Sequence, residues 1–109
     1  MTVADLVQQS GWSPILLADD TREITGGYAG DLLSWVMGRG QYGDCWFTIM
    51  SNLNVIAVAQ LLDVACVVFT EGVVPDAAVV NAARLHDINL IRTDEPTYAA
   101  CVRLGGWMQ

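Results

Sequence analysis

Arg22–Ser34, which reads REITGGYAGDLLS, is the stretch around which the rest of the chain is organised. An extended segment runs into the adjacent glycines Gly26 and Gly27, a third glycine follows, and an amphipathic helical pattern begins. Glycine tolerates a positive φ and lets another backbone or a ligand come close. The helix behind it offers unpaired N–H groups to an anion or polar ligand. We predict a tight strand-to-helix turn here, and the residues leave open whether it binds a ligand.

Two common phosphate-binding motifs do not fit this stretch. The spacing of its glycines does not match G-x-G-x-x-G, the dinucleotide fingerprint. The P-loop motif requires a lysine, and the chain contains none. Any anion bound here would therefore depend on backbone N–H groups and on Arg22.

Outside this stretch, short apolar runs alternate with amphipathic segments. Strands are expected at Ile15–Leu17, Cys45–Met50, Val64–Phe69 and Ile88–Ile91, and a further extended segment at Arg22–Thr25. Helices are expected to start at Thr2, Asp31, Ser51 or Asn52, Pro75–Asp76 and Asp94–Pro96, where capping residues precede apolar periodicity. This alternation predicts an α/β fold: one compact domain spanning 1–109, with βαβ crossovers and a mostly parallel sheet on which helices pack.

The chain also resembles a known family at a series of positions. They are Thr25–Tyr28, Gly30–Ser34, Val36-Met37, Ile49–Asn52, Asn54, Val58-Ala59, Glu71-Gly72 and Pro75. Over nearly the whole chain this pattern resembles the DRTGG-domain family, although Thr21 separates Asp20 from Arg22 where the family name has a contiguous pair. Such domains occur alone, beside CBS-domain pairs and in some phosphotransacetylases, and are similar in fold to the N-terminal domain of HPr kinase/phosphorylase. The resemblance implies a regulatory or binding domain without an established reaction.

Charge and apolar content bound the possible partners. The formal net charge is −7, from twelve acidic residues against five scattered arginines, so we expect neither nucleic acid nor an anionic membrane surface as a partner. Hydrophobic residues make up 53% of the chain and charged residues 16%. A small monomer hides so much apolar surface with difficulty, and we therefore expect a homodimer, with Trp35 or Trp107 in its interface.

Neither a membrane span nor a secretory leader is expected. The apolar run Leu53–Phe69 is interrupted by Gln60 and Asp63 and is short for a span of about 20 residues. It fits a buried helix followed by a buried strand. The N-terminal residues lack the basic and apolar regions of a signal peptide, so we expect a cytoplasmic protein.

Metal, cofactor and nucleophile signals are weak. Cys45, Cys66 and Cys101 are far apart in sequence and form no C-x-x-C, which predicts free thiols in a reducing compartment. The single His86 does not complete a zinc set. We expect no metal, no cofactor and no catalytic residue.

The candidate site follows from the predicted topology. In open parallel sheets, ligands bind beyond the carboxyl ends of the strands, where small polar residues fall in this sequence. The predicted ligand-binding residues are Arg22, Thr25, Gly26, Gly27, Ser51, Asn52 and Glu71. In the competing interpretation, the polar residues of this set only cap helices.

The function predicted from these features is a non-catalytic regulatory or binding module that recognises a small polar or anionic ligand or a partner protein. A small enzyme that uses Glu71 or Asp94 as acid/base is the first alternative. A purely structural dimeric subunit is the second.

Overall fold

The middle strands of the sheet, β3 (Asp44–Thr48) and β4 (Cys66–Phe69), are buried along their whole length. Their sequences are almost continuously apolar, as strands covered on both faces require. In the computed structural model, which describes all of residues 1–109, β2 (Gly26–Ala29) and β5 (Leu90–Arg92) flank them in parallel. β1 (Ser13–Leu16) pairs antiparallel with β5, which gives the order β1-β5-β4-β3-β2.

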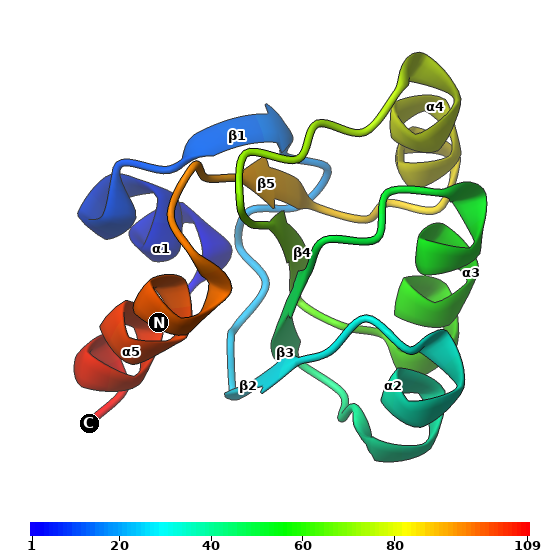
Figure 1. The fold of residues 1–109 in the computed structure, drawn as a ribbon. Coiled ribbons are helices and arrows are strands. Elements are labelled where there is room, and N and C mark those ends of the chain that lie inside the picture. The colour runs from blue at the N-terminus through cyan, green and yellow to red at the C-terminus, as the bar shows by residue number, and fades with distance from the viewer.

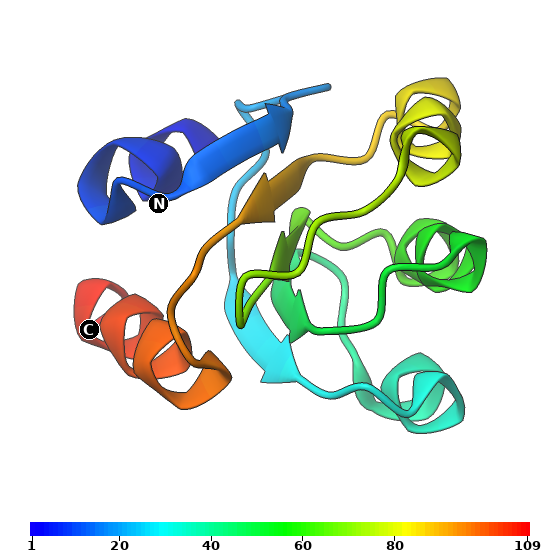
Figure 2. The same cartoon turned by 45° about the horizontal axis from the view of Figure 1, so that its top comes forward.

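Helices cover both faces of this sheet. Figures 1 and 2 show α1 (Val3–Ser10) and α5 (Thr97–Trp107) on one face, and α2 (Leu33–Arg39), α3 (Leu53–Leu62) and α4 (Ala77–Leu85) on the other. The predicted α/β fold class is therefore confirmed, including the mostly parallel sheet and the single compact domain. None of the helices combines the length and apolar character that a bilayer crossing needs.

Alternation along the strands divides the interior into two apolar cores. Trp46 and Phe69 point toward α2, α3 and α4, and belong to a core of 13 buried residues. Their strand neighbours Phe47 and Val68 point toward α1 and α5, and belong to a core of 12. The indole N–H of buried Trp46 donates to the Gly30 carbonyl at 3.0 Å, so its one polar atom is satisfied.

Most predicted helix starts are confirmed. Thr2 and Asp5 form a reciprocal capping box on α1, and Gly11 ends that helix at φ 73°. Asn52 and Asp76 cap α3 and α4 through their side-chain oxygens. These assignments succeeded because each depends on hydrogen bonds between residues close in sequence.

The predicted glycine turn is wrong. Gly26 and Gly27 lie inside β2, in register with the first two residues of β3, and neither has a positive φ. The ladder to β3 holds them extended, and the chain turns after Ala29 instead. The extended segment expected at Arg22–Thr25 joins no strand of the sheet and contributes an isolated bridge between Glu23 and Thr2.

The predicted N-cap role of Asp31 is wrong as well. Its carboxylate accepts hydrogen bonds from the Thr48 hydroxyl and the Ile49 N–H, both at 2.9 Å, at the end of β3. α2 begins after Leu32 with no side-chain cap. Asp31 therefore holds the turn after β2 against the end of β3 instead of capping a helix.

We predict that Gly43→Ala destabilises the fold. Gly43 precedes β3 with φ 78°, and an added Cβ would meet the Thr25 side chain. We expect a loss of about 1–3 kcal/mol in the free energy of unfolding, measured by urea denaturation. Gly38→Ala is the control, because its Cβ in α2 would meet no atom within 4 Å and should stabilise that helix. Equal denaturation midpoints for the two variants would contradict this account of Gly43.

Candidate functional site

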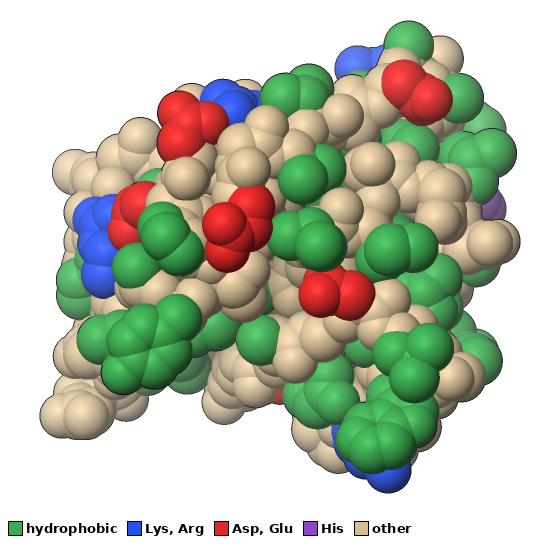
Figure 3. All heavy atoms as spheres, viewed as in Figure 1, with side chains coloured by type: hydrophobic (Ala, Val, Ile, Leu, Met, Phe, Trp, Pro, Cys, Tyr) green, Lys and Arg blue, Asp and Glu red, His purple; other side chains and the backbone are tan.

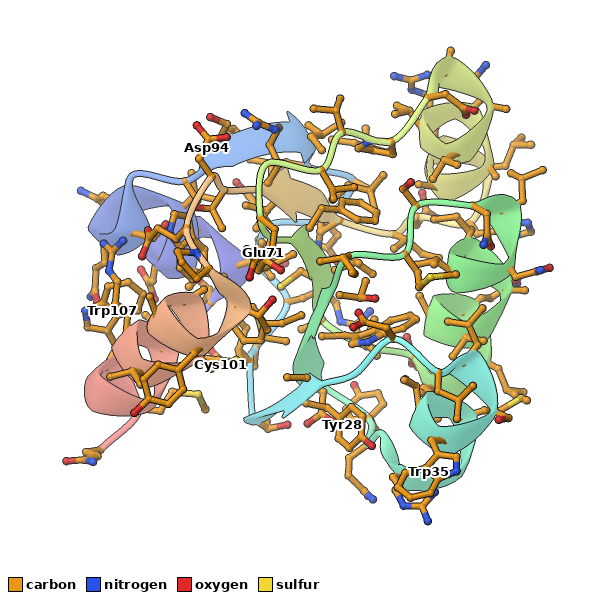
Figure 4. The ribbon with its side chains drawn as sticks, in the orientation of Figure 1. Tyr28, Trp35, Glu71, Asp94, Cys101 and Trp107 are labelled. Carbon is orange, nitrogen blue, oxygen red and sulfur yellow. The ribbon has the colours of Figure 1, made fainter.

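The loops that follow β4 and β5 are joined at the carboxyl edge of the sheet. The N–H of Glu71 donates to the Glu95 carbonyl at 2.9 Å, and the N–H of Gly72 donates to the Thr93 carbonyl at 3.1 Å. Figure 4 shows Glu71 and Asp94 on these neighbouring loops. The polar residues after the two strands therefore share one edge, as parallel topology requires.

Glu71 acts on the start of α5. Its backbone is left-handed, at φ 60°, and its carboxylate accepts a hydrogen bond from the Thr97 N–H at 2.8 Å. The hydroxyls of Thr70 and Thr97 are also hydrogen-bonded, at 2.6 Å. α5 has no side-chain cap from its own first residues, so a carboxylate from the neighbouring loop supplies one.

Glu95 joins three segments of the chain. Its carboxylate accepts hydrogen bonds from the Trp12 indole N–H, at 2.6 Å, and from Arg103. Arg103 also donates to the Ser10 carbonyl at 2.9 Å. The end of α1 is thereby held against α5 and the loop after β5.

A small polar cavity lies beside this network. It has a volume of about 220 Å³ and is lined by residues 10–13 and 92–95. Its cation, Arg92, is paired with Asp94 at 2.6 Å, and the cavity also contains the Glu95 carboxylate. With two carboxylates against one paired arginine, the cavity is poorly suited to an anion.

The predicted site residues do not form one pocket. Ser51, Asn52 and Glu71 lie at the carboxyl edge, whereas Arg22 and Thr25 precede β2 at the amino edge. Arg22 is paired with Asp63 at 3.1 Å, and the Thr25 hydroxyl donates to the Tyr42 carbonyl. A pocket shared by the two groups would require a turn at Gly26 and Gly27, which lie extended in β2 instead.

The remaining predicted residues have identifiable surroundings. Asn52 caps α3 by accepting from the Asn54 N–H at 2.9 Å. Gly26 lies beside Asp44, whose carboxylate would be 2.9 Å from an added Cβ. Gly27 faces α5, where an added Cβ would be 3.2 Å from the Leu104 side chain. A ligand-binding role for these residues stays a prediction.

An apolar cleft between the edge strand and the last helix was missed by sequence reasoning. We call it the β2–α5 cleft; its volume is about 360 Å³, and Figure 4 shows Cys101 on its α5 side. Its lining residues are Gly27, Tyr28, Ala29, Phe47, Cys101, Leu104, Gly105 and Met108. The sequence signal that could have indicated this cleft is the glycine in each of its walls, Gly27 in β2 and Gly105 in α5.

A second apolar surface lies on the opposite face of the sheet. The α2–α3 groove has a volume of about 460 Å³ and is lined by Leu33, Met37, Asn54, Ala57, Val58 and Leu61. In Figure 3, hydrophobic side chains gather over α2 and the adjoining part of α3. The only charged residue of the two helices is Arg39, whose guanidinium lies 3.9 Å from the centre of the Trp35 ring.

Two of the three thiols are poorly placed for nucleophilic chemistry. Cys45 and Cys66 are partners on β3 and β4, and both are fully buried. Burial, together with the neighbouring Cys66 thiol, raises the pKa of Cys45 well above its usual range. No group of three His, Cys, Asp or Glu side chains is arranged to hold a metal ion.

Among solved structures, the fold is similar to that of a regulatory region of a known protein. No protein-family model matches the chain, and no curated protein matches it. The chain is similar to the crystal structure of the CBS and DRTGG domains of the regulatory region of Clostridium perfringens pyrophosphatase, complexed with the activator diadenosine tetraphosphate. The TM-score is 0.71 at 15% identity, over 94% of this chain and 45% of that one. The likeness concerns the fold, and this chain spans less than half of that structure.

We predict that Glu71→Ala destabilises the protein by about 1 kcal/mol, the usual cost of losing a helix cap. Ser51→Ala serves as the control, because the Ser51 side chain makes no hydrogen bond. Thermal unfolding followed by circular dichroism measures both. A Glu71→Ala midpoint equal to that of Ser51→Ala would contradict the capping role.

Asp44 provides a pH-dependent prediction. Burial raises the pKa of this carboxyl in the folded protein, although the Gln41 N–H donates to it at 2.8 Å. The protonated carboxyl therefore contributes fully to the free energy of unfolding below the pKa of an unfolded aspartate, about 3.9. That contribution is lost as the pH rises through the higher pKa of the folded state. We expect Asp44→Asn to gain stability relative to the parent between pH 3 and pH 7, measured by urea denaturation. A constant difference across that range would refute the assignment.

Proposed function

We propose that this chain is a non-catalytic regulatory module of the DRTGG type, which works as a homodimer joined through the α2–α3 groove. The observation that carries the proposal is an apolar, almost uncharged surface on two neighbouring helices of a strongly acidic protein. The fold likeness to a regulatory region supports the general class.

The rim of the groove exposes large apolar side chains. Trp35 is 55% exposed and Leu61 is 67% exposed, and Leu32, Met37 and Leu53 are also exposed. Soluble monomers rarely expose contiguous apolar surface of this kind. By contrast, Trp107, the other tryptophan expected in the interface, packs against Trp12 within the chain at a ring distance of 6.0 Å.

Charge favours a second copy as the occupant. Two molecules of net charge −7 repel each other, and they can meet best where neither carries acidic residues. α2 and α3 contain none. A standard interface takes about 800 Å² from each partner, which is about one-seventh of the 5421 Å² surface of this chain.

Asn54 makes the groove suitable for symmetric pairing. Its side-chain amide is the only polar group that lines the groove, and it is both donor and acceptor. Across a two-fold axis the same amide on each copy can therefore pair with its symmetry mate. A single polar residue in an apolar helix interface fixes register in this way in coiled coils.

A small polar ligand at the carboxyl edge, near Ser51, Asn52 and Glu71, is a competing function within the same class. It is favoured by the nucleotide activator bound to the structural neighbour. Thermal unfolding with diadenosine tetraphosphate tests it, because a ligand of the native state raises the melting temperature. If the ligand raises the melting temperature of the parent but not that of Asn52→Ala, ligand binding at the carboxyl edge is supported.

We predict that the parent protein sediments at twice its chain mass at micromolar concentration. Leu61→Asp, which places a charge in the groove, should weaken dimerisation at least tenfold. Leu85→Asp is the matched control, because Leu85 is an exposed leucine on α4 outside the groove. A monomeric parent, or equal effects of the two substitutions, would contradict the proposal.

A further inference from the structure

The two edges of the sheet differ in their protection against pairing with another strand. β1 contains Pro14, which has no N–H, and its register with β5 shifts between Pro14 and Leu16. β2 contains no proline and no charged residue, and its register with β3 is continuous over Gly26–Ala29. Proline and a break in register, two devices that block a sheet edge, are therefore present on β1 and absent from β2.

β2 also has an uncovered side. Figure 1 shows this strand at the rim of the sheet, with β3 as its only strand neighbour. Half of the backbone N–H and C=O groups in such a strand point away from the sheet. Gly27 and Ala29 are exposed, and their small size leaves the face of β2 toward α5 open.

The β2–α5 cleft adjoins this edge and is shaped to receive an apolar side chain. Phe47 and Leu104 are its buried residues, and Ala29, Cys101 and Met108 surround them. In an added strand, alternate side chains point to the same face. An extended segment paired with β2 would therefore place one side chain over the cleft.

The last turn of α5 keeps the cleft open. Gly105 lines it, and an added Cβ at Gly105 or Gly106 would meet no atom within 4 Å. Glycine in a helix costs about 0.5–1 kcal/mol relative to alanine, and nothing within the chain requires glycine at these two positions. Because Gly105 has no side chain, the cleft has room for a side chain from another molecule.

We propose that the β2 edge and the β2–α5 cleft bind an extended, positively charged peptide segment of a partner protein, which adds a strand to the sheet. Glu23 precedes β2 and Asp31 follows it, both exposed, and Asp31 takes part in no ion pair. Glu23 contacts the terminal amino group at 3.3 Å. Arginine or lysine at the end of the segment beside Asp31 would meet a carboxylate that has no cation, in a chain that contains no lysine of its own.

A second copy fits this edge less well than a cationic peptide does. Symmetric pairing of two copies through β2 must be antiparallel. That arrangement places two chains of net charge −7 edge to edge, and repulsion between like charges opposes it. The α2–α3 groove lies on the other face of the sheet, so dimerisation there leaves β2 free.

Three synthetic pentapeptides test the proposal by NMR titration of the ¹⁵N-labelled protein at low salt. The first, acetyl-RVFVR-amide, places phenylalanine over the cleft and arginines at both ends. The second replaces both arginines with glutamates, and the third is the first with N-methylated valines, which cannot donate to a sheet ladder. We expect the first to shift the amides of Gly26–Ala29 and Gly105, and the other two to bind at least tenfold more weakly.

Two protein variants complete the test. Gly105→Leu fills the cleft and should weaken the first peptide at least fivefold, whereas Gly106→Leu, outside the lining, should bind it as the parent does. Circular dichroism confirms that both variants are folded. Absence of binding by the first peptide, shifts confined to α2 and α3, or equal affinity for the two variants would overturn the proposal.

Discussion

Burial of β3 and β4 on both faces is the constraint on which the rest of the structure depends. Strands without a solvated face need apolar cover above and below, and their backbone groups must be paired by neighbours on both sides. β2 and β5 supply the pairing, and the two helical layers supply the cover. Because all four strands run in parallel, their following loops meet at one edge.

That edge is closed by hydrogen bonds within the chain. Asp31 holds the end of β3, Glu71 caps α5, and Glu95 receives Trp12 and Arg103. Glu71, the carboxylate that the sequence offers as a ligand-binding group at this edge, is thus already engaged. The apolar surfaces remain without partners: the α2–α3 groove on one face, and the β2–α5 cleft on the other. The apolar surfaces are therefore better suited to contact another molecule than the hydrogen-bonded residues of the carboxyl edge are.

Sequence reasoning succeeded where a feature depends on near neighbours and failed where it depends on contacts across the fold. The caps at Thr2, Asn52 and Asp76 use hydrogen bonds within three residues, so their residue types were sufficient. Asp31 bonds to Thr48, 17 residues away, and Glu71 bonds to Thr97, 26 residues away. No local sequence pattern distinguishes a carboxylate with such a distant partner from one that caps a helix or binds a ligand.

The glycine pair illustrates the same limit. Gly26-Gly27 has the composition of a turn, and only pairing with β3 keeps it extended. The β2–α5 cleft arises from segments distant in sequence, so its residues were visible but their proximity was not. The alternation of strands and helices was predictable because each element carries its own apolar periodicity.

Amide hydrogen exchange measured by NMR tests the central claim most directly. If the carboxyl edge is closed by its own hydrogen bonds, the amides of Glu71, Gly72 and Thr97 will exchange nearly as slowly as those of β4. The outward amides of β2 will exchange fast. Exchange of Glu71, Gly72 and Thr97 at the rate of unprotected loop amides would show that the edge is open and would contradict the account.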